Sequence, residues 1–192
     1  MASMAAPVET GRWPDHVSGE WTVESLETLP DNGLRYEILD GTLLVTPSPT
    51  PRHQGAIVEL AVLLRAACPA DHRVFVAPLD WQPDGRTSLE PDLLVVRRDR
   101  IGEKNITQPP ARARRRGPVA GHRPDRSHDQ VLRYAEGGIG QCWIVDPRVP
   151  SVQVYDLVDG AYTLIAEGTG DTPVSVVEPV AVTVVPQLLV DG

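Results

Sequence analysis

A basic segment with almost no apolar side chains interrupts this sequence beyond its midpoint. Residues 109–130 read PPARARRRGPVAGHRPDRSHDQ and hold six of the 18 lysines and arginines. Because burying an unpaired charge costs several kcal/mol, we expect this segment to be irregular and to lie outside any core. The chain on both sides has the patterns of regular secondary structure. We therefore predict one domain over residues 21–192, preceded by a flexible arm over residues 1–20.

The chain before the basic segment predicts alternating helices and strands. Asp40-Gly41, between two alternating runs, is typical of a two-residue β-hairpin turn. Thr50 followed by Pro51 is typical of a helix start. The run Leu93–Val96 is continuously apolar, as in a strand buried on both faces. The expected elements are a short helix over 21–29, a hairpin over 36–45, a helix over 51–68 and strands over 74–77 and 93–96.

The chain after the basic segment is rich in β-strand patterns. Gly137-Gly138 indicates the end of a helix, and a strand is predicted over 142–145. Asp159-Gly160, again between alternating runs, predicts a second hairpin. Residues 174–190 form a further β-rich stretch. A mixed fold of helices and strands follows from these patterns.

Composition limits the classes of protein to consider. Of 192 residues, 41% are hydrophobic, which is enough for a core, and the formal net charge of −8 disfavours general binding to polyanions. Two cysteines are too few for a disulfide framework, so a reducing, cytoplasmic setting is expected. The first residues lack a signal-peptide pattern, and no segment is long and apolar enough for a membrane span, so no membrane partner is expected.

Five segments in order resemble the bacterial Uma family of restriction endonucleases, within the PD-(D/E)XK superfamily. They are YEILDGTLLVTPSPTPRHQ, VFVAPLDW, PDLLVV, RYAEGGIGQCWIVDP and VQVYDL with its hairpin, and together they cover roughly residues 21–190. The resemblance implies an α/β (α+β) fold, with a restriction-endonuclease-like mixed β-sheet flanked by helices and a C-terminal β-hairpin. It also implies metal-dependent hydrolysis of DNA with Mg²⁺ or Mn²⁺, since hard divalent ions prefer carboxylate oxygens. A homodimer would suit cutting both strands.

The resemblance places two carboxylates in the active site. Asp92 of PDLLVV matches the family's first acid, and Glu37 of YEILDG matches an additional acid near the metal. Taken without the family, Asp92 after Pro91 is a solvated cap or turn residue, and Glu37 between Tyr36 and Ile38 is a solvent-facing strand residue. The residues alone also favour structural roles elsewhere: a surface or capping role for His53, a turn for Asp146, solvated helix positions for Glu59 and Arg65, and core positions for Trp81 and Trp143.

The second acid and the lysine of the family pattern are missing. They belong between PDLLVV and RYAEGGI, where Arg116 stands at the position of the acid and Gln130 at that of the lysine. Lys104, the chain's single lysine, lies before this segment. The chain as it stands is therefore expected to be impaired as a nuclease.

One interpretation of the basic segment is a reading-frame error. Read from the second nucleotide of each codon, the usual GC-rich codons for residues 111–130 permit LVLVVEVLSPGTGRIDRTTK, which has Glu at 116 and Lys at 130. The alternatives are a genuine arginine-rich loop of a catalytically inactive nucleic-acid- or protein-binding module, with Arg112, Arg114 and Arg115 as contacts, or an unstable remnant of the family. Sequencing the gene would separate the frame error from the others.

Overall fold

The computed structural model describes residues 21–46, 49–102, 119–122 and 128–191. The helices are α1 (Val23–Leu26), α2 (Pro51–Ala67) and α3 (His128–Glu136), with short 3₁₀ turns η1 (Arg98–Arg100) and η2 (Pro186–Leu189). The strands are β1 (Arg35–Leu39), β2 (Thr42–Thr46), β3 (His72–Val76), β4 (Trp81–Asp84), β5 (Thr87–Leu89), β6 (Leu93–Arg97), β7 (Val119–His122), β8 (Gln141–Asp146), β9 (Ser151–Val158), β10 (Ala161–Thr169), β11 (Val174–Val176) and β12 (Val182–Val184).

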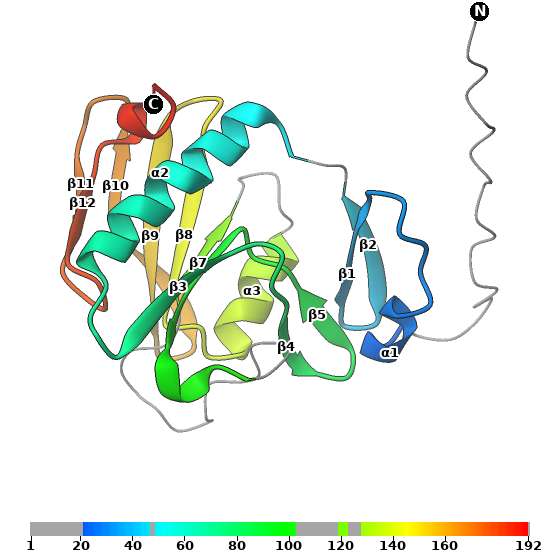
Figure 1. Ribbon diagram of the computed structural model, residues 1–192. Coiled ribbons are helices and arrows are strands. Elements are labelled where there is room, and N and C mark those ends of the chain that lie inside the picture. Colours follow the sequence, from blue (N-terminus) through cyan, green and yellow to red (C-terminus); the bar gives the residue numbers. More distant parts are fainter. Residues whose placement is uncertain (1–20, 47–48, 103–118, 123–127, 192) are drawn as a thin grey trace, which may run out of the picture.

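Two sheets and a small ribbon organise these strands (Figure 1). The larger sheet has six strands in the order β10-β9-β8-β7-β6-β3, and the smaller has four in the order β2-β1-β5-β4. Within the larger sheet β7 and β8 are parallel, whereas the other neighbours are antiparallel. The expected mixed sheet flanked by helices is confirmed.

Strand β6 serves two hydrophobic clusters, because its side chains alternate between the faces of the sheet. Leu93 and Val95 pack into the cluster under α2, with Trp143, while Leu94 and Val96 pack into the cluster that contains Trp81. All four apolar side chains are at most 2% exposed. The prediction of a strand buried on both faces is confirmed, as are the core positions of the two tryptophans.

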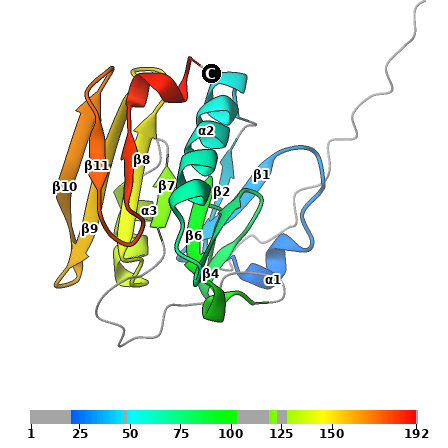
Figure 2. The same ribbon diagram turned by 60° about the vertical axis from the view of Figure 1, so that its left-hand side comes forward.

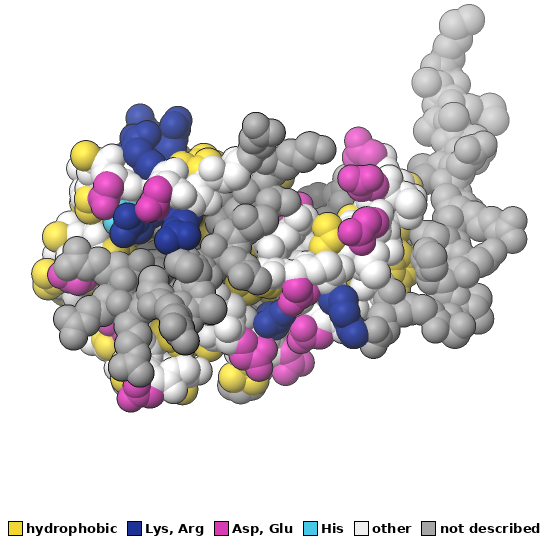
Figure 3. All heavy atoms as spheres, turned by 90° about the horizontal axis from the view of Figure 1, so that it is seen from below, with side chains coloured by type: hydrophobic (Ala, Val, Ile, Leu, Met, Phe, Trp, Pro, Cys, Tyr) yellow, Lys and Arg dark blue, Asp and Glu magenta, His cyan; other side chains and the backbone are white. Residues whose placement is uncertain are grey.

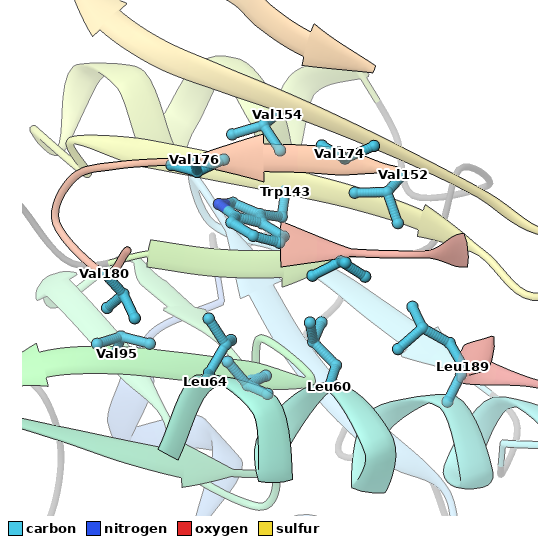
Figure 4. Packing of buried hydrophobic residues seen from close by; sticks show 13 residues of the cluster. Leu60, Leu64, Val95, Trp143, Val152, Val154, Val174, Val176, Val180 and Leu189 are labelled. Atoms are coloured by element: carbon cyan, nitrogen blue, oxygen red, sulfur yellow. The ribbon is translucent and has the colours of Figure 1, made fainter. Parts of the chain in front are cut away.

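Helix α2 covers one face of the larger sheet together with β11, β12 and η2 (Figure 2). Thr50 caps the helix, its side chain accepting a hydrogen bond from the backbone N–H of His53 at 3.3 Å, and Pro51 occupies the first turn. Leu60 and Leu64 point from the helix toward Trp143 and Val95 (Figure 4). The predicted helix start, with Thr50 as cap and Pro51 in the first turn, is present.

The two predicted hairpin turns are present. Asp40 and Gly41 have φ angles of 48° and 82°, and Asp159 and Gly160 have 50° and 87°. Positive φ at both central residues matches the right-handed twist of the paired strands, which explains the Asp-Gly sequences. The turns join β1 to β2 and β9 to β10.

The expectation that residues 109–130 are irregular is wrong at two places. Val119–His122 forms β7, whose backbone pairs with β6 and β8 in the middle of the larger sheet, and α3 begins at His128. The sequence Val-Ala-Gly-His contains no arginine, so a short strand forms there without requiring a buried guanidinium. The rest of the segment, and the expected arm over 1–20, lie outside the described residues.

None of the described helices is both long and apolar enough to cross a membrane.

Candidate functional site

Asp92 lies directly before β6 and is buried, with 7% of its surface exposed. Its Oδ1 accepts a hydrogen bond from Nη1 of Arg35 at 3.1 Å. Its Oδ2 lies 3.3 Å from Nε2 of His53. The backbone carbonyl of Asp92 also accepts a hydrogen bond from Ala77 N–H, at 3.1 Å, which holds the start of β6 beside the end of β3. These contacts are unlike those of a solvated cap residue.

Glu37 is 1% exposed, so the reading of it as a solvent-facing strand residue is wrong. Its Oε1 accepts a hydrogen bond from the backbone N–H of Glu90 at 2.7 Å. This bond links β1 of the smaller sheet to the segment that enters β6 of the larger one. Both acids expected from the family pattern therefore lie at the junction of the two sheets.

Arg35 joins the two acids, and sequence reasoning missed it. Its Nη1 and Nη2 contact Asp92 and Glu37 at 3.1 and 3.4 Å. Its Nε lies 3.2 Å from Oε1 of Glu90, an ion pair without the alignment of a hydrogen bond. The sequence alone could have linked Arg35 to Glu37. The two residues are two positions apart in a predicted strand, so their side chains lie on the same face of it.

His53 is a second residue that the sequence did not assign to this site. It was expected at the surface or in a capping role, but its side chain is 8% exposed and faces Asp92. The first turn of α2 carries it there, since Thr50 fixes where the helix begins. A small cavity beside His53 and Asp92 is otherwise lined by apolar side chains of α2, β6, and the end of β8.

Asp80 adds a further carboxyl group close to Glu37. Burial raises the pKa of Asp80 above its ordinary value of 3.8, the charge of Glu37 raises it further, and Arg35 partly offsets both effects. Asp80 lies directly before β4 and Trp81. The carboxyl groups around Arg35 thus come from three separate segments: Glu37 from β1, Asp80 from the residue before β4, and Glu90 and Asp92 from the entry to β6.

The substitution Asp80→Asn is expected to stabilise the protein at neutral pH. A pKa that is higher in the folded state means that the folded state binds the proton more tightly, so stability falls as pH rises from the ordinary pKa through the raised one. Asparagine removes this loss. The free energy of unfolding, measured in urea, should therefore be higher for Asp80→Asn than for wild type at about pH 7. This difference should disappear at about pH 3, below both pKa values. A difference that is the same at the two pH values would contradict the assignment.

Of the two positions where the family pattern has its second acid and its lysine, the structure describes only Gln130. Arg116 lies outside the described residues, as do Arg112, Arg114 and Arg115. Gln130 lies in the first turn of α3 and is 4% exposed, and its Oε1 accepts no hydrogen bond within the described part of the chain. A buried amide oxygen in this state costs stability.

A divalent ion does not fit the site in this arrangement. Carboxylate oxygens are suitable ligands for Mg²⁺ or Mn²⁺. However, Glu37, Glu90 and Asp92 each already direct an oxygen at the guanidinium of Arg35. Among the described residues, no three acidic, histidine or cysteine side chains converge as a metal-binding group.

Comparison with known proteins finds similar solved structures and a matching family. A crystal structure of "a putative nuclease belonging to DUF820" from Anabaena variabilis is similar in fold, with a TM-score of 0.61 and 21% identity over 81% of this chain and 88% of that one. No curated protein matches. The family model described as "Uma2: Putative restriction endonuclease" matches residues 23–184. The chain therefore belongs to the Uma2 family of restriction-endonuclease-like proteins.

Proposed function

We propose that this chain is a DNA nuclease of its family whose active site is incomplete. Asp92 and Glu37 are the proposed catalytic carboxylates. The observation that supports them is their convergence on one guanidinium, from β1 of one sheet and the start of β6 of the other. Isolated acidic residues on a surface would not converge on one partly buried arginine in this way.

The residues around Arg35 have defined roles in this proposal. His53 faces Asp92, with its Nε2 3.3 Å from Oδ2 but without the alignment of a hydrogen bond, and would contact this carboxylate as the site binds its substrate. Glu37 holds the backbone of Glu90, which sets the path of the chain into Asp92. The family's chemistry would draw on Mg²⁺ or Mn²⁺ to polarise the phosphate.

The electrostatics of the site explain why activity is expected to be weak in the present sequence. Among the described residues, three carboxyl groups face one guanidinium, and these residues alone would present like charge to a DNA phosphate at close range. The lysine position is taken by Gln130, which adds no positive charge. Figure 3 shows the face away from the first turn of α2, where Lys and Arg side chains of the described residues lie beside Asp and Glu. Binding of duplex DNA by two copies would suit cleavage of both strands.

Plasmid cleavage tests the proposal. Supercoiled plasmid incubated with Mg²⁺ or Mn²⁺ is expected to stay intact with the present chain. It is expected to be nicked or linearised by a variant whose residues 111–130 are replaced with LVLVVEVLSPGTGRIDRTTK, because that segment restores an acid at 116 and a lysine at 130. Asp92→Ala within the rebuilt variant should abolish cleavage. A folded rebuilt variant that leaves the plasmid intact, or cleavage that survives Asp92→Ala, would count against the proposal.

A further inference from the structure

The guanidinium of Arg35 has a separate carboxyl group at each of its nitrogens. Nε faces Glu90 at 3.2 Å, Nη1 faces Asp92 at 3.1 Å and Nη2 faces Glu37 at 3.4 Å. The planar fork of an arginine suits such an arrangement, because its donors point outward in fixed directions. Among the described residues, one cation is thus surrounded by three acids that come from one strand and one strand entry.

Burial makes this cation necessary for the fold. The side chains of Glu37 and Asp92 are 1% and 9% exposed, and that of Glu90 is 18% exposed. Carboxylates brought together at low exposure repel one another and lose hydration, so they require a positive partner. An arginine meets this requirement, because its guanidinium is positively charged and presents several donors.

We propose that Arg35 is the resident cation of this site, holding Glu37, Glu90 and Asp92 together in the position that a divalent ion would otherwise occupy. The proposal rests on the assignment of Glu37 and Asp92 to the nuclease site. Its consequence is competition, in which a metal ion gains these oxygens only as the arginine gives them up. Arg35 is 19% exposed and is the first residue of β1, so its side chain has solvent on one side into which it can withdraw.

Metal binding to the full-length chain, without any substrate, tests this competition. Wild-type protein and Arg35→Gln are titrated with Mn²⁺ and followed by calorimetry and by thermal unfolding. Arg35→Gln is expected to melt at a lower temperature than wild type in chelator, to regain stability as Mn²⁺ is added, and to bind Mn²⁺ at least about tenfold more tightly than wild type. Equal Mn²⁺ affinity in the two proteins would overturn the proposal.

Arg133 provides a matched control in the same chain. Its side chain is 15% exposed and also contacts three acids, with Asp40 at 3.1 Å, Glu136 at 3.4 Å and Asp84 as the third. Arg133→Gln should lower the melting temperature, but Mn²⁺ should not restore it, because these acids belong to the surface between α3 and two turns. Equal restoration in both variants would indicate nonspecific binding to acidic side chains and would overturn the proposal.

Two additional variants keep the outcome interpretable. If Arg35→Gln does not fold, Arg35→Lys replaces it, because lysine keeps a charge that reaches fewer carboxylates. Arg35→Lys should bind Mn²⁺ more tightly than wild type. Unchanged affinity would overturn the proposal. Asp92→Asn combined with Arg35→Gln should remove the Mn²⁺-dependent gain, and its persistence would show that the ion binds elsewhere. These readouts need no DNA, so the two proposals can be judged separately. Mn²⁺ affinity that does not depend on Arg35 would overturn the competition even if the rebuilt variant cleaves plasmid. A rebuilt variant that leaves plasmid intact would count against the nuclease assignment even if Arg35→Gln binds Mn²⁺ more tightly.

Discussion

Replacement of Trp81 by alanine is expected to lower the free energy of unfolding by about 3–5 kcal/mol, the range typical of a large aromatic side chain removed from a core. Trp81 is completely buried, at 0% exposure. Its ring lies 5.2 Å from that of Tyr134 in α3. Its six-membered ring fills the space above Gly137, where a methyl group would overlap it.

Urea unfolding monitored by circular dichroism would measure this loss of stability. Two control variants would show whether the loss comes from the volume of the buried ring. Trp81→Phe should cost less, since Nε1 of Trp81 makes no hydrogen bond within the described part of the chain and only ring volume is lost. Val177→Ala, at a position 79% exposed, should change stability by less than about 0.5 kcal/mol. A Trp81→Ala protein as stable as wild type would mean that the cluster between the sheets and α3 is not packed as described.

Replacement of Glu37 by leucine is expected to lower the free energy of unfolding by about 2–3 kcal/mol, the cost of leaving buried polar groups without a charged acceptor. The backbone N–H of Glu90 would lose its 2.7 Å hydrogen bond. Arg35 would lose one of its three acidic contacts. Both losses weaken the contacts between β1 and the entry to β6, so the smaller sheet should be held less firmly against the larger one.

Glu37→Gln separates the contribution of the hydrogen bond from Glu90 N–H from that of the negative charge beside Arg35. The amide keeps an oxygen that can accept from Glu90 N–H but lacks the charge, so its cost should be about 1 kcal/mol, close to that of one ordinary hydrogen bond. Glu167→Leu, on the exposed side of β10, serves as a control for removing a glutamate as such. The comparison is again by urea unfolding. Equal losses for Glu37→Leu and Glu167→Leu would show that the buried hydrogen bond contributes little.

Local sequence rules predicted much of the fold because the relevant interactions are local. Asp40-Gly41 and Asp159-Gly160 specify their turns through backbone conformation alone. Thr50 and the apolar run over 93–96 likewise carry their structural meaning within a few residues. The family pattern, rather than spacing, pointed to Glu37 and Asp92.

The features that the sequence did not reveal depend on distant contacts. His53 looked like a surface residue because nothing near it in the chain indicates that the first turn of α2 faces Asp92. Arg35 required knowledge of where Glu90 and Asp92 lie relative to β1. Strand β7 is too short and too poor in apolar residues to be recognised alone, and it is stabilised by strands on both of its sides.

The placement of Arg35 also affects the order in which the site is assembled during synthesis. Arg35 and Glu37 share β1, so this acid has a neighbouring counter-charge as soon as its strand forms. Asp92 emerges later, with the strand that links both hydrophobic layers. The two acids therefore come together only once the ribosome has made the chain as far as β6.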